Sequence, residues 1–153
     1  MIQGFKLTEN LVRFETGFED WKDAIRLSAQ ALVSEEYMTE EYVQAMIDSV
    51  LEHGPYIVIA PNIAMPHARP EKGAKKVGFS ITVCEQPVKF EDDPQFHARL
   101  LVTLSCVDAN THLEMMMALV NVLGDDAQVE KILTTRDKQT ILDLFNQEDL
   151  EHA

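Results

Sequence analysis

No run of about 18 apolar residues occurs in the 153-residue chain, so no segment is expected to cross a membrane. The opening stretch MIQGFKLTENLVRF also lacks the basic patch and apolar core of a secretory signal. Cysteine is scarce, and the two cysteines, Cys84 and Cys106, lie in apolar runs without the spacing of metal ligands. These absences predict a cytoplasmic protein with buried thiols, without direct membrane insertion and without a disulfide framework.

Basic residues are few, with 13 Lys and Arg against 26 Asp and Glu, which gives a net charge of −13. Nucleic acid is excluded as a partner because its phosphates would be repelled. The acidic balance fits a protein partner with a basic docking face, although charge that serves only solubility gives the same composition. The segment 67–76 is different, because an anion would be attracted to its four bases: Arg69, Lys72, Lys75 and Lys76.

The length of 153 residues suits one domain with a core and is too short for two. No repeat or linker divides the chain, so we expect a single domain over 1–153 with a core over about 7–146. Apolar periodicity predicts strands at 10–15, 56–60, 77–84 and 99–107, with 86–90 continuing the third after a turn. It predicts helices at 21–33, 39–53, 111–123, 125–133 and 137–146. This order predicts an α/β fold, a three-layer sandwich with a mixed, mostly parallel sheet of about five strands and helices on both faces.

Residues that can cap a helix stand before each predicted helix. Their side-chain oxygens accept hydrogen bonds from the free N–H groups of the first turn. Gly54-Pro55 is expected to end the second helix. The expected caps, in chain order, are Thr16 or Asp20, Thr39, Asp108 or Asn110, Asp125 and Asp137.

The stretch PNIAMPHARP, residues 61–70, places His67 among three prolines after the predicted strand at 56–60. A residue before proline avoids the α region and proline fixes its own φ, so Met65-Pro66 is a rigid support for the imidazole. Imidazole titrates at about pH 6.5, so much of it is neutral and nucleophilic at cellular pH. His67 is therefore a candidate nucleophile, and an incidental histidine in a surface turn is the alternative.

His112, in the segment DANTH, follows the predicted strand at 99–107 and stands at the start of a helix. Helix N-termini carry roughly half a positive charge and free N–H groups, which suit a phosphate. An imidazole there could hydrogen-bond a phosphoryl oxygen and stabilise a negatively charged transition state. The alternative is a polar residue of the first helical turn with no such role. Both histidines nevertheless follow strands, where ligands of open α/β sheets bind.

A metal site is the competing hypothesis, since two histidines and a carboxylate could bind zinc. No His-x-x-x-His or Cys-x-x-Cys spacing occurs, and Arg69 beside His67 would repel a cation, so neither metal nor cofactor is expected. A cysteine nucleophile is disfavoured because both cysteines lie in buried-strand contexts. Weaker candidates are His53 at a helix end, His97 in a surface loop and His152 in the tail.

Two segments together resemble the cytosolic enzyme IIA components of the bacterial sugar phosphotransferase system (PTS), of the mannitol/fructose type. They are PYIVIAPNIAMPHARPEKGAKKVGFSITVCEQPVKF and DANTHLEMMMALVNVL. Within this superfamily the loop is most similar to that of the ascorbate-specific IIA proteins, with HGPY before the strand and MPH-x-RPE after it. The resemblance extends from about Leu7 to Phe145.

The resemblance implies a phosphotransferase that carries a phosphoryl group as a phosphohistidine. His67 would accept the group on its tele nitrogen from phospho-HPr and pass it to a cysteine of the IIB component, which serves the membrane component IIC in L-ascorbate uptake. His112 would hydrogen-bond the phosphoryl group or hold His67 in its tautomer. No nucleotide fold is then needed, and no Gly-x-x-x-x-Gly-Lys loop is present.

The chain departs from the mannitol-specific members at one position. Those members carry an arginine on the second helix, in the segment that reads MIDSV here, whereas this chain has Ser49. Arg69 could take over the phosphate contact, contact a partner protein or remain a solvated charge. The resemblance also leaves open a IIA component for fructose, mannitol or galactitol, and a regulatory sensor that binds its targets according to phosphorylation.

Overall fold

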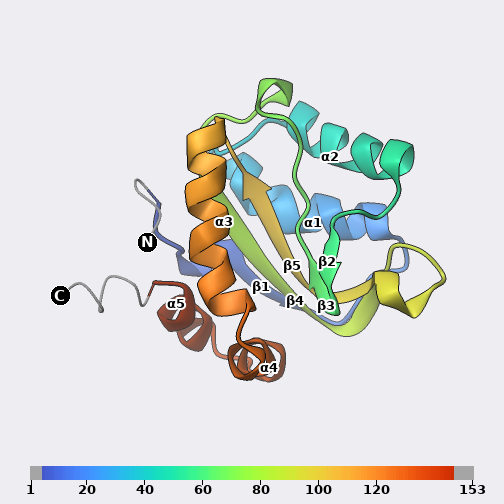
Figure 1. Ribbon diagram of the computed structural model, residues 1–153, viewed down its shortest axis with the longest axis vertical. Helices are drawn as coiled ribbons and strands as arrows, with labels where there is room; N and C mark the ends of the chain where they lie inside the picture. Colours follow the sequence, from blue (N-terminus) through green and yellow to red (C-terminus); the bar gives the residue numbers. More distant parts are fainter. Residues whose placement is uncertain (1–4, 147–153) are drawn as a thin grey trace.

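A five-stranded open sheet forms the centre of residues 5–146, the part of the chain that the computed structural model describes (Figure 1). The strands β1 (Val12–Glu15), β2 (Val58–Ala60), β3 (Asn62–Ala64), β4 (Gly78–Lys89) and β5 (His97–Ser105) lie in the order β1-β4-β5-β3-β2. The pairs β1–β4 and β3–β5 are parallel, and the pairs β4–β5 and β2–β3 are antiparallel. The predicted mixed sheet of about five strands is confirmed.

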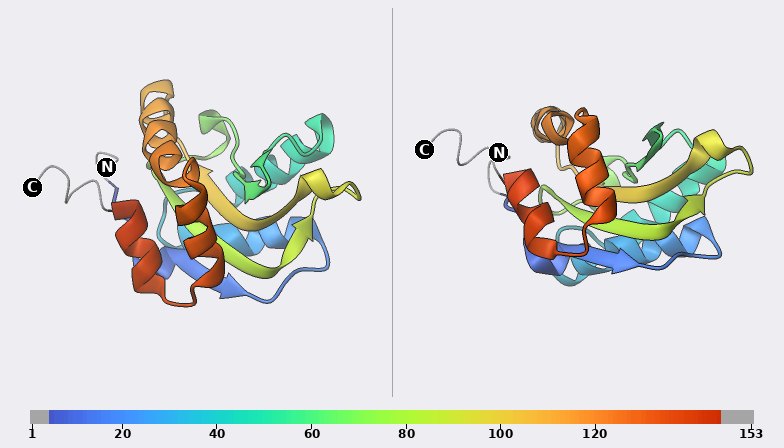
Figure 2. Two further views of the ribbon diagram at one scale, coloured as in Figure 1. Left: turned by 60° about the horizontal axis from the view of Figure 1, so that its bottom comes forward. Right: turned by 90° about the horizontal axis from the view of Figure 1, so that it is seen from below.

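Helices cover both faces of this sheet (Figure 2). On one side lie α1 (Trp21–Ser34) and α2 (Glu40–His53), and on the other α3 (Ala109–Leu123), α4 (Asp126–Thr134) and α5 (Lys138–Asn146). Neighbouring β4 side chains show the two faces, because side chains alternate along a strand. Ser80 Oγ donates to the carbonyl of Ser28 in α1 (2.7 Å), whereas the Phe79 ring centroid lies 5.5 Å from that of Phe145 in α5. The predicted three-layer arrangement is therefore confirmed.

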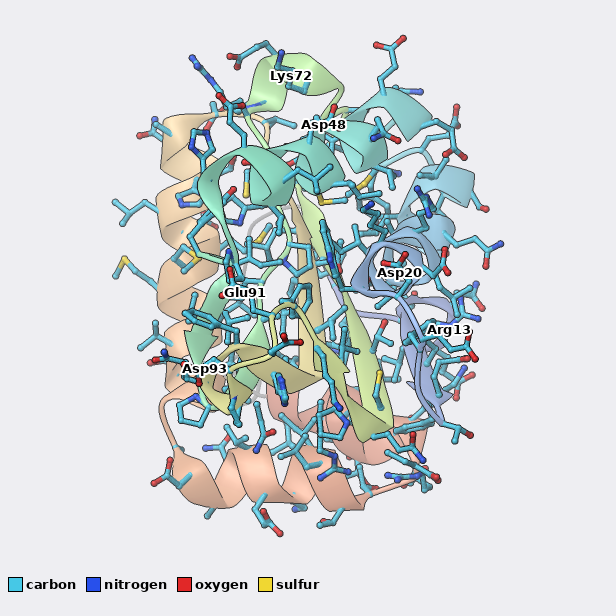
Figure 3. All side chains as sticks on the ribbon, turned by 90° about the vertical axis from the view of Figure 1, so that its right-hand side faces the viewer. Arg13, Asp20, Asp48, Lys72, Glu91 and Asp93 are labelled. Carbon is cyan, nitrogen blue, oxygen red and sulfur yellow. The ribbon has the colours of Figure 1, made fainter. Side chains whose placement is uncertain are left out.

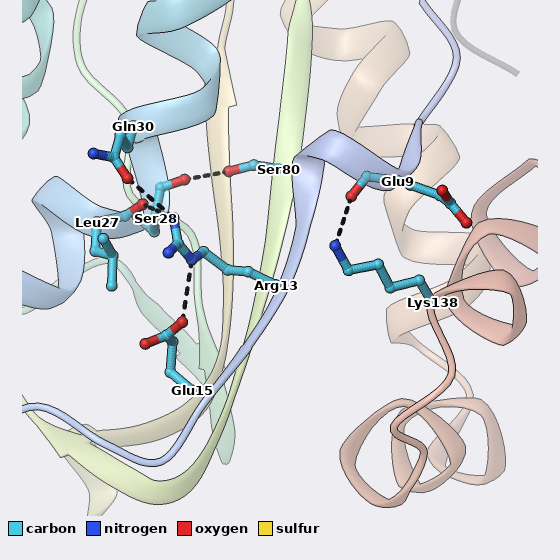
Figure 4. A network of polar contacts seen from close by, with 8 residues as sticks. All are labelled: Glu9, Arg13, Glu15, Leu27, Ser28, Gln30, Ser80 and Lys138. Atoms are coloured by element: carbon cyan, nitrogen blue, oxygen red, sulfur yellow. Dashed lines mark hydrogen bonds and ion pairs between the residues drawn. The ribbon is translucent and has the colours of Figure 1, made fainter.

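Polar contacts link the edge strand β1 and the turn before it to their neighbours (Figure 4). The Arg13 guanidinium of β1 donates to the Leu27 carbonyl and to the Gln30 side chain of α1, at 3.3 Å each. Lys138, at the start of α5, donates to the Glu9 carbonyl in the short helix η1 (Glu9–Leu11) at 3.2 Å. Layers on both faces of the sheet are thus tied to the N-terminal segment.

The five predicted helix caps are confirmed. Asp20, Thr39, Asp108, Asp125 and Asp137 each accept a hydrogen bond from a backbone N–H in the following turn. At α3 the cap is reciprocal, since the Asp108 carboxylate accepts from the Thr111 N–H (2.8 Å) while the Asp108 N–H donates to the Thr111 hydroxyl (3.3 Å). Before α1 and α3 the aspartates act as the caps, instead of the alternatives Thr16 and Asn110.

The prediction of one strand at 56–60 followed by a loop is wrong in part. β2 covers only Val58–Ala60, after which the chain turns at Pro61-Asn62 and returns antiparallel to β2 as β3. Asn62 has a φ of +69°, a left-handed value that asparagine tolerates better than most residues. A strand of three residues shows no periodicity, so the pattern of apolar residues could not reveal β3.

β4 continues where the sequence predicted a turn after Cys84, and it ends only at Lys89. Its register with β5 shifts between Val83 and Val88, so Pro87 lies in an irregular part of the ladder where its missing N–H is tolerated. The N–H of Gln86 instead donates to the Thr16 carbonyl beyond β1, at 2.9 Å. The proline therefore bends the pairing without ending the strand.

The two cysteines are buried as free thiols, as predicted. Within residues 5–146, no helix is both long and apolar enough to cross a membrane. The prediction of one domain over 1–153 includes residues 1–4 and 147–153, and His152 among them, which lie outside the described residues.

Candidate functional site

His67 lies at the edge of the sheet where the parallel strands β3 and β5 end. His67 was predicted to follow the strand at 56–60 directly. It instead follows β3, the next strand along the chain. Backbone hydrogen bonds hold the two residues before it: the Met65 N–H donates to the Ile57 carbonyl (2.8 Å), and the Leu104 N–H of β5 donates to the Pro66 carbonyl (2.9 Å). Both supporting residues are buried, so the imidazole projects from a fixed backbone.

The contact of His67 with its own backbone decides which ring nitrogen is reactive. Nδ1 lies 2.7 Å from the carbonyl oxygen of Met65. A carbonyl oxygen can only accept, so Nδ1 carries the proton of the neutral ring. Nε2 then keeps its lone pair, and the ring is only half-buried. The arrangement presents Nε2 as a nucleophile.

A buried tyrosine of α2 fixes the chain on the other side of His67. The Tyr42 hydroxyl donates to the Ala68 carbonyl (2.9 Å) and accepts from the Ala68 N–H (3.1 Å). Burial raises the pKa of Tyr42 to about 12, so the hydroxyl remains protonated and able to make both bonds. The backbone on both sides of His67 is thereby held to neighbouring elements.

His112 is the fourth residue of α3, and its ring lies close to that of His67. The ring centroids are 6.2 Å apart, with the planes inclined by 48°. Helical side chains lean toward the N-terminus of their helix, so His112 points back over the Asp108 cap toward the sheet. Its Nδ1 lies 3.4 Å from the sulfur of Cys106, the residue directly after β5. The structure therefore brings the two predicted histidines together.

Ser49 of α2 and Tyr56, which follows that helix, form another side of the site. Their hydroxyl oxygens are 2.7 Å apart and share one hydrogen bond. The Tyr56 ring meets the His67 ring edge to face, with the centroids 5.8 Å apart. Because two hydroxyls own two protons and use one between them, the second proton can be donated to an acceptor in the site. Ser49 thus belongs to a pair of neutral donors.

The four clustered bases do not all face the histidines. Arg69 is 82% exposed and forms an ion pair with Glu71, Nε to Oε1 at 2.8 Å. Lys72 lies on the short helix η2 (Pro70–Lys72), at the end of the molecule where Asp48 of α2 also lies (Figure 3). The other two bases turn toward the end of α1: Lys75 pairs with Glu36 at 3.5 Å, and Lys76 lies over the Tyr37 ring at 4.4 Å. The cluster that the sequence suggested is therefore divided.

His67 and His112 line a single hollow of about 400 Å³. Three separate segments form its walls: the end of α2 with the residues after it, the loop that carries His67, and the junction of β5 and α3. The other lining residues are Ser49, Tyr56, Ala68, Arg69, Pro70, Cys106, Asp108 and Ala109.

The remaining described histidines lie outside this hollow. His53 forms an edge contact with Tyr56, with ring centroids 6.3 Å apart, and lies 3.9 Å from the Glu52 carboxylate. His97 is the first residue of β5, not a loop residue as predicted, and its Nε2 lies 2.9 Å from the Glu91 carbonyl. Among the described residues, no three His, Cys, Asp or Glu side chains gather as a metal site would require.

Sequence reasoning assigned no role in the site to Tyr42, Tyr56 or the thiol of Cys106. Tyr42 belongs to the apolar stripe of its helix, and only its hydroxyl among aliphatic neighbours distinguishes it. Tyr56 was predicted within a strand, but it lies before β2 and its side chain is exposed. These roles depend on contacts between residues that are distant in sequence or beyond the reach of a periodic pattern.

Comparison with known proteins shows the family of the chain. Residues 6–148 match the family model described as "Phosphoenolpyruvate-dependent sugar phosphotransferase system, EIIA 2". The chain is 39% identical, over 142 residues and 92% of both chains, to the ascorbate-specific PTS system EIIA component of Escherichia coli (strain K12).

Two solved structures share the fold closely. The solution structure of the mannitol-specific cryptic phosphotransferase enzyme IIA CmtB of Escherichia coli has a TM-score of 0.86 and 35% identity, covering 96% of this chain and 99% of that one. The IIA protein in the complex of enzyme IIA and phosphorylated enzyme IIB for mannitol, also from Escherichia coli, has a TM-score of 0.80 and 25% identity, covering 94% and 99%. The chain therefore belongs to the EIIA 2 family of the phosphoenolpyruvate-dependent sugar phosphotransferase system, and it is a phosphotransferase of that system.

Proposed function

We propose that His67 is the phosphoryl acceptor of this phosphotransferase and that the group is carried on Nε2. The observation that supports this most directly is the 2.7 Å contact of Nδ1 with the Met65 carbonyl, which leaves the lone pair on Nε2. In the first step Nε2 attacks the phosphorus of phospho-HPr, and the nitrogen–phosphorus bond of the donor breaks with its electron pair returning to the donor. In the second step a cysteine thiolate of IIB attacks the phosphorus and Nε2 leaves.

His112 is proposed to donate a hydrogen bond to the phosphoryl group on His67. The supporting geometry is the 6.2 Å separation of the ring centroids across one hollow. Ser49 and Tyr56 offer a further neutral donor, whereas Arg69 is engaged by Glu71. Phosphoryl transfer depends mainly on stabilising the negative charge of the phosphoryl oxygens. Several neutral hydrogen-bond donors around these oxygens can therefore replace one arginine.

The proposed partners are HPr as donor and IIB as acceptor, in the cytoplasm, with the membrane component IIC reached through IIB. The apolar surface near the histidines supports docking there. An exposed stripe on α3 starts beside His112, and another exposed group lies around Tyr56 at the end of α2 and on β2. Exposed apolar side chains beside a reactive group are typical of a protein-binding surface. They are Leu113, Met117 and Val120, and Leu51, Tyr56 and Ile59.

The transported substrate is proposed to be L-ascorbate. The 39% identity with the ascorbate-specific component over 92% of both chains supports it, as does Ser49 at the place where the resemblance leads one to expect arginine in mannitol-specific members. The competing substrate is mannitol, supported by 35% identity with the mannitol-specific enzyme IIA. Phosphorylated protein should transfer its group to an ascorbate-type IIB faster than to a mannitol-type IIB. The reverse order would favour mannitol, and transfer to neither would favour a regulatory sensor.

The acceptor assignment is tested by incubating the protein with phosphoenolpyruvate, enzyme I and HPr and measuring intact mass. The wild type should gain one acid-labile phosphate, and His67→Ala should gain none. His112→Ala should retain the acceptor but slow the transfer by about 10- to 1000-fold, as for loss of one preorganised donor. His53→Ala, outside the hollow, is the matched control and should behave as wild type. Phosphate on His67→Ala would show that another residue is the acceptor.

A further inference from the structure

The thiol of Cys106 contacts the imidazole of His112. Cys106 directly follows β5 and is only 3% exposed. Its sulfur lies 3.4 Å from Nδ1 of His112, within the range of a sulfur hydrogen bond. Cys106, His112 and His67 all line the same hollow, and the two imidazole centroids lie 6.2 Å apart. Cys106 is therefore placed to act on the phosphoryl site through His112.

The thiol keeps its proton under cellular conditions. Burial, with a smaller contribution from the nearby Asp108 carboxylate, raises the pKa of Cys106 to about 11. A neutral thiol has one S–H to donate, whereas its sulfur is a weak acceptor. The S–H can donate to a neutral His112 ring when Nδ1 offers its lone pair. In that pairing the ring proton of His112 is on Nε2.

We propose that Cys106 is a positioning residue that holds neutral His112 in the Nε2–H tautomer, so that the phosphoryl group on His67 meets a hydrogen-bond donor. This inference rests on the proposed function of His67 and His112. It gives the two histidines opposite proton arrangements, each set by the group that touches Nδ1. A carbonyl acceptor at His67 leaves Nε2 with a lone pair, and a thiol donor at His112 leaves Nε2 with a proton.

The tautomer can be read directly in the unphosphorylated protein. In long-range ¹H–¹⁵N spectra of the full chain labelled in histidine, recorded at a pH where imidazole is neutral, His112 should show a pyridine-type Nδ1 and a protonated Nε2. His67 should show the opposite pattern. In Cys106→Ala the Nδ1 of His112 loses its donor, so its resonance should shift and the Nε2–H population should fall. Cys106→Ser, which restores a donor, should return the spectrum toward wild type.

Phosphoryl transfer provides the second readout. Loss of one neutral hydrogen bond should slow transfer from phospho-HPr by about 2- to 10-fold in Cys106→Ala, with recovery in Cys106→Ser. The matched control is Cys84→Ala, which removes the other buried thiol, in β4 and outside the hollow. Its His112 spectrum and its transfer rate should match wild type. A general loss of packing would affect both alanine variants and would not be repaired by serine alone.

The inference is overturned if the wild-type spectrum shows the proton of neutral His112 on Nδ1. It is equally overturned if the His112 signals of Cys106→Ala and Cys106→Ser both coincide with those of wild type. Should an alanine variant fail to fold, the wild-type and serine spectra still decide. Failure of the proposed function would appear separately, as phosphate gained by His67→Ala, and would leave the measured tautomer unchanged.

Discussion

At the scale of one residue, the hydroxyl of Tyr42 positions the backbone beside His67, the proposed nucleophile. The side chain never enters the hollow, yet both of its hydrogen bonds go to the residue that follows His67. A phenylalanine would fill the same space in the core but would leave the partly buried amide and carbonyl of Ala68 without this partner. The residue therefore serves packing and positioning at once, through different atoms.

We predict that Tyr42→Phe lowers the free energy of unfolding by about 1–3 kcal/mol, because the N–H and C=O groups of Ala68 lose their hydrogen-bond partner. It should also slow phosphorylation of His67, since the loop loses its attachment to α2. Urea denaturation and the mass assay measure the two effects. Tyr56→Phe is the control for stability. Among residues 5–146 its hydroxyl bonds only Ser49, at an exposed position, so its loss should cost less than about 0.5 kcal/mol. Equal stability of the two variants would contradict the assignment.

At the scale of elements, the N-terminus of α3 has two tasks. It carries His112 over the hollow, and it is itself closed by Asp108, whose carboxylate accepts the Thr111 N–H. A capping carboxylate offsets part of the positive end of the helix. A phosphate near α3 therefore relies on the imidazole and hydroxyl donors more than on the helix dipole. The same cap chemistry recurs at α4, where Asp125 accepts from the N–H groups of Ala127 and Gln128.

The capping aspartates make the free energy of unfolding depend on pH in the acidic range. The pKa of Asp108 lies below its ordinary value of 3.8, mainly because of the Thr111 N–H, and that of Asp125 also lies below it, mainly because of the Gln128 side chain. The unfolded chain therefore binds these protons at higher pH than the folded one. Their stabilising contribution is present above about pH 4 and is lost as the pH falls through the folded pKa.

Asparagine caps a helix as aspartate does but does not titrate. When the pH is lowered from about 5 to about 2, the Tm of the double variant Asp108→Asn, Asp125→Asn should therefore fall less than the Tm of wild type. Thermal unfolding followed by circular dichroism across this range measures the difference. An identical fall in both proteins would show that other carboxylates account for the whole acid dependence.

At the scale of the whole molecule, the core includes two thiols that are kept neutral. Burial is the largest cause that raises the pKa of both Cys84 and Cys106, from 9.0 to about 11. In the unfolded chain they would ionise at the lower value. The stability that each thiol contributes is therefore complete below pH 9 and is lost as the pH rises through about 11.

Cys84→Ala should weaken this alkaline dependence, although it also lowers stability at neutral pH by leaving a cavity. Urea midpoints at intervals from pH 8 to pH 11 should fall less steeply for the variant than for wild type. Parallel curves for the two proteins would show that the Cys84 thiol does not contribute to the alkaline loss.

The features that could be predicted from sequence are those with a local signal. Periodic apolar residues and caps located five helices and the long strands, and the Pro-His motif and the DANTH segment identified His67 and His112. β3 could not be predicted because three residues carry no period and prolines surround them. The hydrogen bonds of Tyr42 and Cys106 depend on packing between elements, which no single stretch encodes.

The bond between the Leu104 N–H and the Pro66 carbonyl has a consequence for the newly made chain. During synthesis His67 leaves the ribosome before β5, so the proposed acceptor is at first without the strand that supports it. Its neighbour His112 follows later still. A nascent or truncated chain that lacks the β5–α3 segment thus contains the proposed acceptor residue but not the complete hollow around it. On the proposed assignment, phosphorylation of His67 therefore requires that β5 and α3 have been made and have packed beside it.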